Sequence, residues 1–137
     1  METAGTFLPE TAAEARERYE DCGPTAQVVV REVAKAMDFD AEEYGRRVTG
    51  EVVETAREAI FAATLAIRVG TRKEYEDWRA GADHDVHEVG SEHVDNVVWH
   101  APPFAEEAVA ATFQDERRAA VETLRRQALG RIYSEVV

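Results

Sequence analysis

Cysteine is almost absent from this sequence of 137 residues, and so are long apolar runs. Cys22 is the only cysteine, so no disulfide can form within the chain and oxidising secretion is not implied. The residues after Met1 lack the basic and apolar regions of a signal peptide. No apolar run approaches the roughly 20 residues that span a bilayer. We therefore expect a cytoplasmic protein that has no membrane segment.

Lysine is also scarce, because only Lys35 and Lys73 are lysines among 16 basic residues and the rest are arginines. Asp and Glu together supply 28 residues, which gives a net charge of -12. This imbalance is typical of proteins in a halophilic cytosol. Multimolar salt there shortens the Debye length to below about 3 Å, so the repulsion between carboxylates is screened. Arginine is retained because its planar fork pairs with carboxylates at two points. We expect the fold to require salt for its stability.

The first 63 residues show the apolar periodicity of helices. One helix is expected to begin near Pro9 and to end at a Gly23-Pro24 turn. A second helix, Thr25–Met37, carries so many apolar residues that we expect it to be well buried. Asp40 and Thr49 are N-cap candidates for a short turn and for a further helix.

From residue 64 the pattern predicts a βαβββα unit. Residues 65–69 alternate as a strand does, and Thr71 with Glu74 matches the capping-box spacing of a helix that stops at Gly81. Residues 85–89 and 94–100 are predicted to form a hairpin around Gly90-Ser91.

Residues Phe104–Gln114 are ambiguous between a strand and an extension of the last helix. We prefer the strand, because the joined helix would exceed 30 residues, far above the usual length. Asp115 is the expected N-cap of the last helix, which should cover a sheet face and bring Leu124 into one core with Trp99. The chain is therefore expected to be a single α+β domain, 1–137. A helical part, 1–63, precedes the βαβββα part, 64–137, whose mainly antiparallel sheet is covered by the C-terminal helix.

Four segments together resemble a small haloarchaeal family of unknown function, and the resemblance extends over nearly the whole chain. The segments are Pro24–Met37, Val94–His100, Ala111–Gln114 and Thr123–Ala128. The family brings no activity, ligand or catalytic residue to carry over. The resemblance supports the halophilic interpretation and adds nothing on mechanism.

All four histidines lie in one acidic window of 17 residues: His84, His87, His93 and His100. Imidazole and carboxylate ligands would suit zinc, nickel or iron if three of them converged. Strand alternation works against this, since His84 and His87 would face opposite sides of a strand. We therefore expect half-exposed histidines and no tightly bound metal, with the four residues kept as weak candidates.

The step from the predicted strand at Val69 into the next helix is a candidate anion site. Unpaired backbone N–H groups and the helix dipole favour an anion there. The candidate residues are Arg68, Gly70, Thr71, Arg72 and Lys73. The alternative is that Thr71 and Glu74 simply cap the helix, in which case Glu74 occupies the donor that an anion needs.

Residues Val33–Val48 have the spacing of a helix-turn-helix, with Arg46 and Arg47 in the second segment. Glu42 and Glu43 in the same segment repel phosphate. Nucleic-acid binding is therefore an alternative but not the preferred interpretation, because affinity for nucleic acids comes mainly from phosphate neutralisation.

No cofactor motif is present, and the eight glycines are scattered. The preferred hypothesis is a non-enzymatic binding or interaction protein without a cofactor, self-associating through an exposed strand edge or helix face. One alternative is a helix-turn-helix nucleic-acid regulator. The other is a metal protein or enzyme that uses the His84–His100 region.

Overall fold

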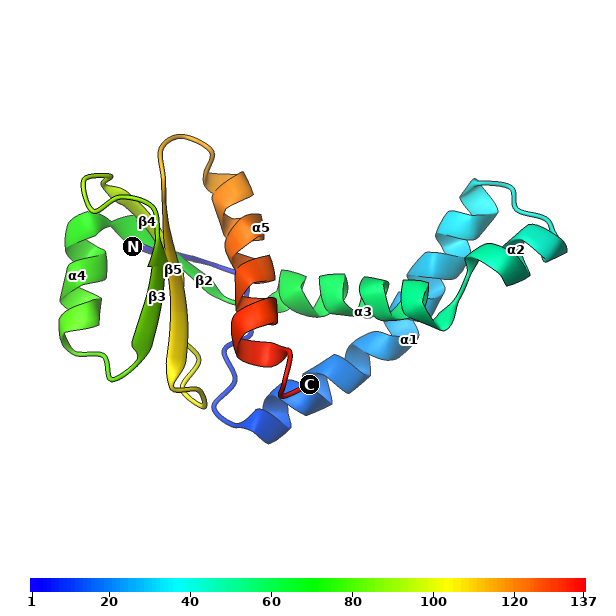
Figure 1. The fold of residues 1–137 in the computed structure, drawn as a ribbon, viewed down its shortest axis with the longest axis horizontal. Helices are drawn as coiled ribbons and strands as arrows, with labels where there is room; N and C mark the ends of the chain where they lie inside the picture. The colour runs from blue at the N-terminus through cyan, green and yellow to red at the C-terminus, as the bar shows by residue number, and fades with distance from the viewer.

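The computed structural model describes all residues, 1–137, as a five-stranded sheet from which a helical arm projects (Figure 1). The predicted α+β class is confirmed, with the last helix packed on the sheet. The strands are β1 Glu2–Ala4, β2 Ile67–Thr71, β3 Asp85–Val89, β4 Asn96–His100 and β5 Glu107–Phe113. The helices are α1 Ala12–Ala36, α2 Ala41–Arg47, α3 Gly50–Thr64, α4 Arg72–Ala80 and α5 Arg117–Ala128, followed by a π-helical turn, η1, Leu129–Tyr133.

The sheet has the order β1-β2-β4-β5-β3, so the predicted hairpin between residues 85–89 and 94–100 is wrong. Both strands exist, but β3 pairs in parallel with β5, and β4 lies between β2 and β5. Burial explains the order, because β4 is buried along almost its whole length and takes the centre, whereas β3 is half-exposed at the edge. The preferred strand within Phe104–Gln114 is confirmed as β5.

The edge strand β1 was not expected from the sequence. It pairs antiparallel with β2 over three residues, which are too few to show an alternating pattern. Gly5 then turns the chain with a φ of 90°, and a Cβ there would lie 2.4 Å from the carbonyl oxygen of Leu65. Glycine at this position therefore lets the N-terminal segment pass close to the start of β2.

The two faces of the sheet carry separate apolar clusters, because successive strand residues point to opposite sides. Leu124 of α5 is fully buried in the larger cluster, together with Val98 and Phe61. Trp99 lies on the opposite face, where it packs with Tyr75 of α4. The prediction that Trp99 and Leu124 share one core is therefore wrong, since the neighbours Val98 and Trp99 face different layers.

Helix α1 runs through the predicted Gly23-Pro24 turn without ending there. Proline has no N–H for the carbonyl of Glu20. Instead, Nη2 of Arg57 on α3 donates to this oxygen at 3.5 Å. A Cβ at Gly23 would lie 2.6 Å from the same Nη2, so the glycine makes room for the guanidinium. Helix α3 thus supplies the donor that Pro24 lacks, and α1 continues where the sequence pattern predicts its end.

Because α1 continues past Pro24, Cys22 lies inside this helix and not at a helix C-terminus. Its side chain is buried against the main core, and burial raises the pKa of the thiol above its usual value. The thiol is therefore held in its neutral, unreactive form.

The predicted helix caps are mostly confirmed. The side chain of Asp40 accepts from the N–H of Glu43 at 2.8 Å, and that of Thr49 accepts from Val52 at 3.2 Å. Asp115 is the exception, because Glu116 precedes α5 and no side chain caps this helix. No helix of the protein is long and apolar enough to cross a membrane.

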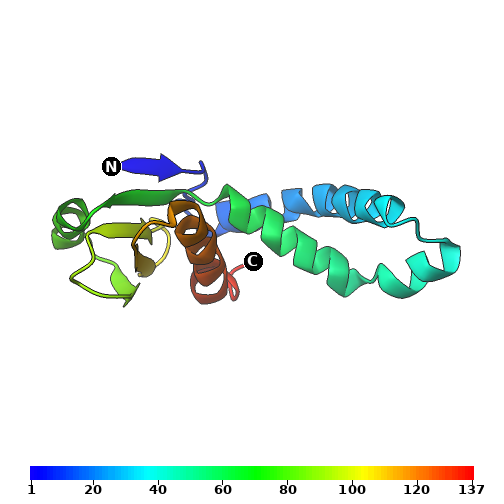
Figure 2. The ribbon, with the colours of Figure 1, turned by 90° about the horizontal axis from the view of Figure 1, so that it is seen from above.

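The arm consists of the distal half of α1, the short α2 and most of α3. In two views it extends away from the sheet and from α5, with α2 at its tip (Figures 1 and 2). Near the sheet, α1 and α3 join the main core through Ala15 and Phe61. Toward the tip, the two helices pack only on each other and on α2, so no third layer covers them.

Candidate functional site

The start of α4, where an anion site was predicted, is occupied by groups of the chain itself. The hydroxyl of Thr71 accepts from the N–H of Glu74 at 3.1 Å, and the Glu74 carboxylate accepts from the N–H of Thr71 at 2.9 Å. The amino group of Met1 pairs with the same carboxylate at 2.7 Å and, with Thr71, lowers its pKa. The capping box is therefore confirmed, and Gly70 packs beside it with the Glu74 carboxylate close by.

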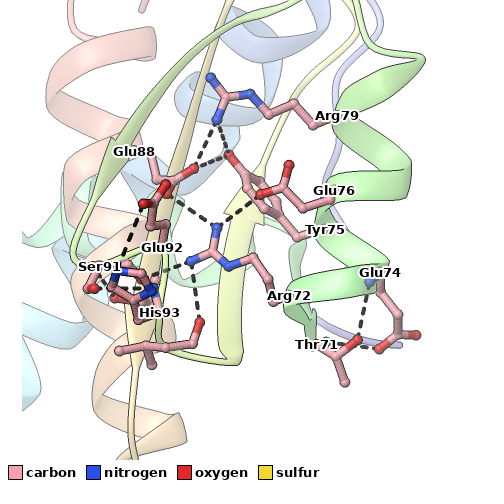
Figure 3. Close-up of polar contacts among 12 residues, drawn as sticks. Thr71, Arg72, Glu74, Tyr75, Glu76, Arg79, Glu88, Ser91, Glu92 and His93 are labelled. Atoms are coloured by element: carbon pink, nitrogen blue, oxygen red, sulfur yellow. Dashed lines mark hydrogen bonds and ion pairs between the residues drawn. The ribbon is translucent and has the colours of Figure 1, made fainter.

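The predicted cations near the start of α4 lie in separate surroundings. Arg72 binds Glu76 and Glu88, and its Nη2 donates to the carbonyl oxygens of Ser91 at 2.9 Å and Val94 at 3.3 Å (Figure 3). Lys73 pairs with Asp77 on the exposed side of α4. Arg68 pairs with no carboxylate and with no carbonyl oxygen, and it lines a separate cavity beside Trp99. Anion binding by the five residues together stays a prediction.

Glu88 on β3 is the centre of a polar cluster that sequence reasoning missed (Figure 3). Its carboxylate accepts from the hydroxyl of Tyr75 at 2.8 Å and from Nη1 of Arg79 at 2.9 Å. Burial raises the pKa of Tyr75, and the Glu88 carboxylate raises it further. The cluster fastens α4 to the edge strand β3, while Arg72 holds the loop that follows β3. The available signal was the spacing of Arg72, Tyr75 and Arg79, which places all three on one side of α4.

The four histidines lie in separate surroundings. Nε2 of His84 is 3.0 Å from the carbonyl oxygen of Pro102, and His87 pairs with Glu107 across β3 and β5 at 2.8 Å. His93 is exposed beside Glu92. No group of three His, Cys, Asp or Glu side chains is arranged to hold a metal ion.

His100 is the one histidine inside the protein. Its Nδ1 is 2.7 Å from the carbonyl oxygen of Ala66, which can only accept, so Nδ1 carries the proton. Nε2 then accepts from the hydroxyl of Tyr133 at 2.8 Å. Burial lowers the pKa of His100 to about 4, so the ring is neutral near pH 7 and joins β4 to η1.

The predicted helix-turn-helix residues form the tip of the arm. Helix α2 has only seven residues, and its Arg47 pairs with Glu43 at 3.8 Å and lies over the ring of Phe39. Arg46 is exposed and has no ion pair. DNA binding through this segment stays a hypothesis.

The tip of the arm also carries an apolar groove of about 360 Å³. Of its eight lining residues only Arg47 is polar; the others are Val30, Val33, Ala34, Met37, Phe39, Val48 and Val52. Val33 is 52% exposed, Met37 57% and Val52 42%, values typical of surface residues. The expectation of a well-buried second helix is therefore wrong for its distal part, because α3 covers only one side of it.

An uncharged stripe on α3 continues this groove toward the sheet. Ala56, Ala59 and Ala63 follow Val52 at helical spacing; Ala59 and Ala63 are exposed and Ala56 is partly buried. Val29, Val33 and Met37 recur every four residues on α1 and lie on one side of it. We call these seven residues the arm face. In a chain with 32% charged residues, a charge-free surface on a projecting hairpin is unusual.

The comparisons with known proteins place this arm and sheet in a single family. Residues 6–134 match the family of unknown function DUF5809. The chain belongs to this family. No curated protein and no solved structure matches the DUF5809 chain significantly. The match covers the arm and all strands of the sheet except β1, and it assigns no activity to either part.

Proposed function

We propose that this DUF5809 chain is an interaction protein that binds a second copy of itself through the arm face. The observation that carries the proposal is the arm face itself, which is apolar, exposed and continuous over two helices. Helices of globular proteins bury such faces against another layer. Two arms packed face to face would form a four-helix bundle, the smallest arrangement that covers both helices of each arm.

The shape of the arm face supports a second copy as the occupant. Bulky side chains, Val33 and Met37, project from α1, whereas small alanines, such as Ala59, line the stripe on α3. In a two-fold arrangement each surface meets its counterpart on the partner, so the ridge of one arm can lie on the alanine stripe of the other. Self-complementarity of this kind requires no other protein.

The exposed apolar area indicates a reversible association. Val29, Val33, Met37 and Val52 are each about half exposed. Burying the remainder of one such side chain contributes roughly 1 kcal/mol, which gives on the order of 8 kcal/mol over two copies. Association costs about 4 to 15 kcal/mol in lost freedom, so these side chains leave a net gain of at most about 4 kcal/mol, and the dimer should exchange with monomer at roughly millimolar concentrations.

The charge of the chain connects this proposal with a salt-rich environment. Each copy carries a net charge of -12, so two copies repel each other unless salt screens them. We propose a halophilic, haloarchaeal cytoplasm as the setting, where this screening is always present. Dimer formation should then strengthen as KCl increases.

The test compares two substitutions on the same helix. Val33→Glu places a charge on the arm face, whereas Val28→Glu places it at an equally exposed valine that does not line the groove. Light scattering at millimolar chain concentration in 3 M KCl should show that Val33→Glu is monomeric and that Val28→Glu dimerises like the unmodified chain. Circular dichroism confirms that both variants are folded.

Other outcomes contradict the proposal. If both variants dimerise equally, the association uses another surface, such as the edge of β3. If the unmodified chain is monomeric at all concentrations, the arm face has a different occupant. Ala59→Arg gives a second test of the same surface. A bulky charged side chain on the alanine stripe should weaken the dimer as Val33→Glu does.

A further inference from the structure

A cavity of about 240 Å³ lies on the α4 side of the sheet, away from the arm. Arg68 of β2 and Trp99 of β4 are directly opposite each other in the sheet and both line it. Trp78 of α4 forms another wall, and Thr3 and Thr6 of the N-terminal segment complete it. Three parts of the chain that are distant in sequence therefore enclose one space.

Arg68 is distinguished from the other partly buried arginines by its lack of a partner. It is partly buried, yet it makes no ion pair, hydrogen bond or cation–π contact. The other arginines that are buried or partly buried all have such contacts: Arg18 with Phe7, Arg57 with Glu54, Arg72 with Glu88, and Arg125 with Glu122. No nitrogen of Arg68 is among the buried unpaired atoms, so its guanidinium is open to the cavity and free to pair with an anion there.

Trp99 forms the wall of the cavity opposite Arg68. Its side chain is 1% exposed, and its Nε1–H has no acceptor anywhere in the protein. An indole N–H can only donate, and leaving such a donor unpaired inside a protein costs about 1 to 3 kcal/mol. This nitrogen has almost no accessible surface, so a ligand does not reach it, and Trp99 contributes only its ring to the wall of the cavity.

The remaining walls define the chemistry of the ligand. No Asp or Glu lines the cavity, although the chain has 28 of them. His100 also lines it, but both of its ring nitrogens are bonded to Ala66 and Tyr133, so it adds no charge. The ring centroids of Trp78 and Trp99 lie 5.9 Å apart, and the ring planes make an angle of 31°. The two indoles therefore offer flat apolar surface. The cavity thus combines one positive charge with aromatic walls.

We propose that this cavity binds a small aromatic monocarboxylate, whose carboxylate pairs with Arg68 and whose ring lies against the two indoles. The volume equals that of about eight water molecules at roughly 30 Å³ each, which suits a single ring of benzoate size. Arginine and a planar carboxylate form two parallel hydrogen bonds, so the pair also sets the orientation of the ring. This binding site is separate from the arm face and does not depend on dimerisation.

The experiment uses the fact that Trp78 and Trp99 are the only tryptophans of the chain. Benzoate is titrated into the full chain at the lowest KCl concentration that keeps the native circular dichroism spectrum, and tryptophan fluorescence and heat are recorded. We expect saturable binding with equal affinities from both signals. Benzyl alcohol, which has the ring but no charge, should bind at least about tenfold more weakly, since a charge-assisted hydrogen bond contributes about 1.5 to 3 kcal/mol.

Arg68→Gln should reduce the benzoate affinity about tenfold or more and leave that for benzyl alcohol unchanged. Arg31→Gln is the matched control, because Arg31 is an exposed arginine without an ion pair on the arm, and it should bind benzoate like the unmodified chain. The proposal is overturned if benzoate does not saturate the fluorescence change by about 10 mM, or if Arg68→Gln binds it normally. Acetate binding as tightly as benzoate would overturn the aromatic part of the proposal.

Discussion

Acidification should destabilise this protein through His100 before most of its carboxylates are protonated. Burial lowers the pKa of His100 from 6.5 to about 4, so between these values the unfolded chain binds a proton that the folded chain does not. Stability is therefore complete above pH 6.5 and falls as the pH falls toward 4. The difference in pKa corresponds to about 3 kcal/mol, at roughly 1.4 kcal/mol per unit.

The assay is urea unfolding at several pH values in 3 M KCl, comparing the unmodified chain with His100→Gln. Glutamine can donate to Ala66 and accept from Tyr133 but cannot take up a proton, so the slope of unfolding free energy against pH should be shallower by up to about 1.4 kcal/mol per unit between pH 6 and 4.5. His93→Gln removes an exposed imidazole and should keep the original slope. Equal slopes for the unmodified chain and His100→Gln would refute the reasoning.

Three further predictions concern stability. The melting temperature should rise markedly from 0.1 M to 3 M KCl, because the charge of -12 must be screened; equal melting temperatures would exclude a halophilic adaptation. Leu124→Ala should lower the unfolding free energy by about 2 to 5 kcal/mol, whereas the exposed Thr123→Ala should change it by less than about 0.5 kcal/mol, both measured by urea unfolding. Glu88→Gln should cost about 1 to 2 kcal/mol because it weakens the hydrogen bonds from Tyr75 and Arg79, while Glu92→Gln, at an exposed carboxylate, should be neutral; a neutral Glu88→Gln would show that this cluster does not stabilise the fold.

Local signals along the chain were sufficient to predict most helices and strands. The side chains of Asp40, Thr49 and Thr71 cap helices as their spacing indicates, because a cap depends on residues only three positions apart. The strand within Phe104–Gln114 followed from a limit on helix length. These features require no knowledge of the rest of the fold.

Errors arose wherever a distant segment decides the local outcome. Pro24 reads as a helix end until Arg57, 37 residues after Glu20, supplies the missing donor. The order of β3 and β4 depends on which strand is buried on both faces, and alternation within each strand does not show this. The apolar stripe of Thr25–Met37 predicts burial, but it cannot tell whether the cover comes from this chain or from a second copy.

The candidate sites show the same distinction. Arg68 was among the predicted anion ligands on the basis of its neighbours in sequence, but its surroundings are set by Trp78 and Trp99, which come from other elements. The residues next to it, Arg72 and Lys73, have carboxylate partners on their own helix or on β3. A sequence shows which residues can bind an anion, and the fold determines which of them is left without a partner.

The most direct test of the central claim is the mass of the unmodified chain in solution, measured by sedimentation equilibrium in 3 M KCl over a wide range of concentrations. If the arm face binds a second copy, the weight-average mass should rise with concentration from 15.3 kDa toward twice that value. The same series for Val33→Glu should stay at the monomer mass. A mass of 15.3 kDa for the unmodified chain up to several millimolar would contradict self-association through the arm.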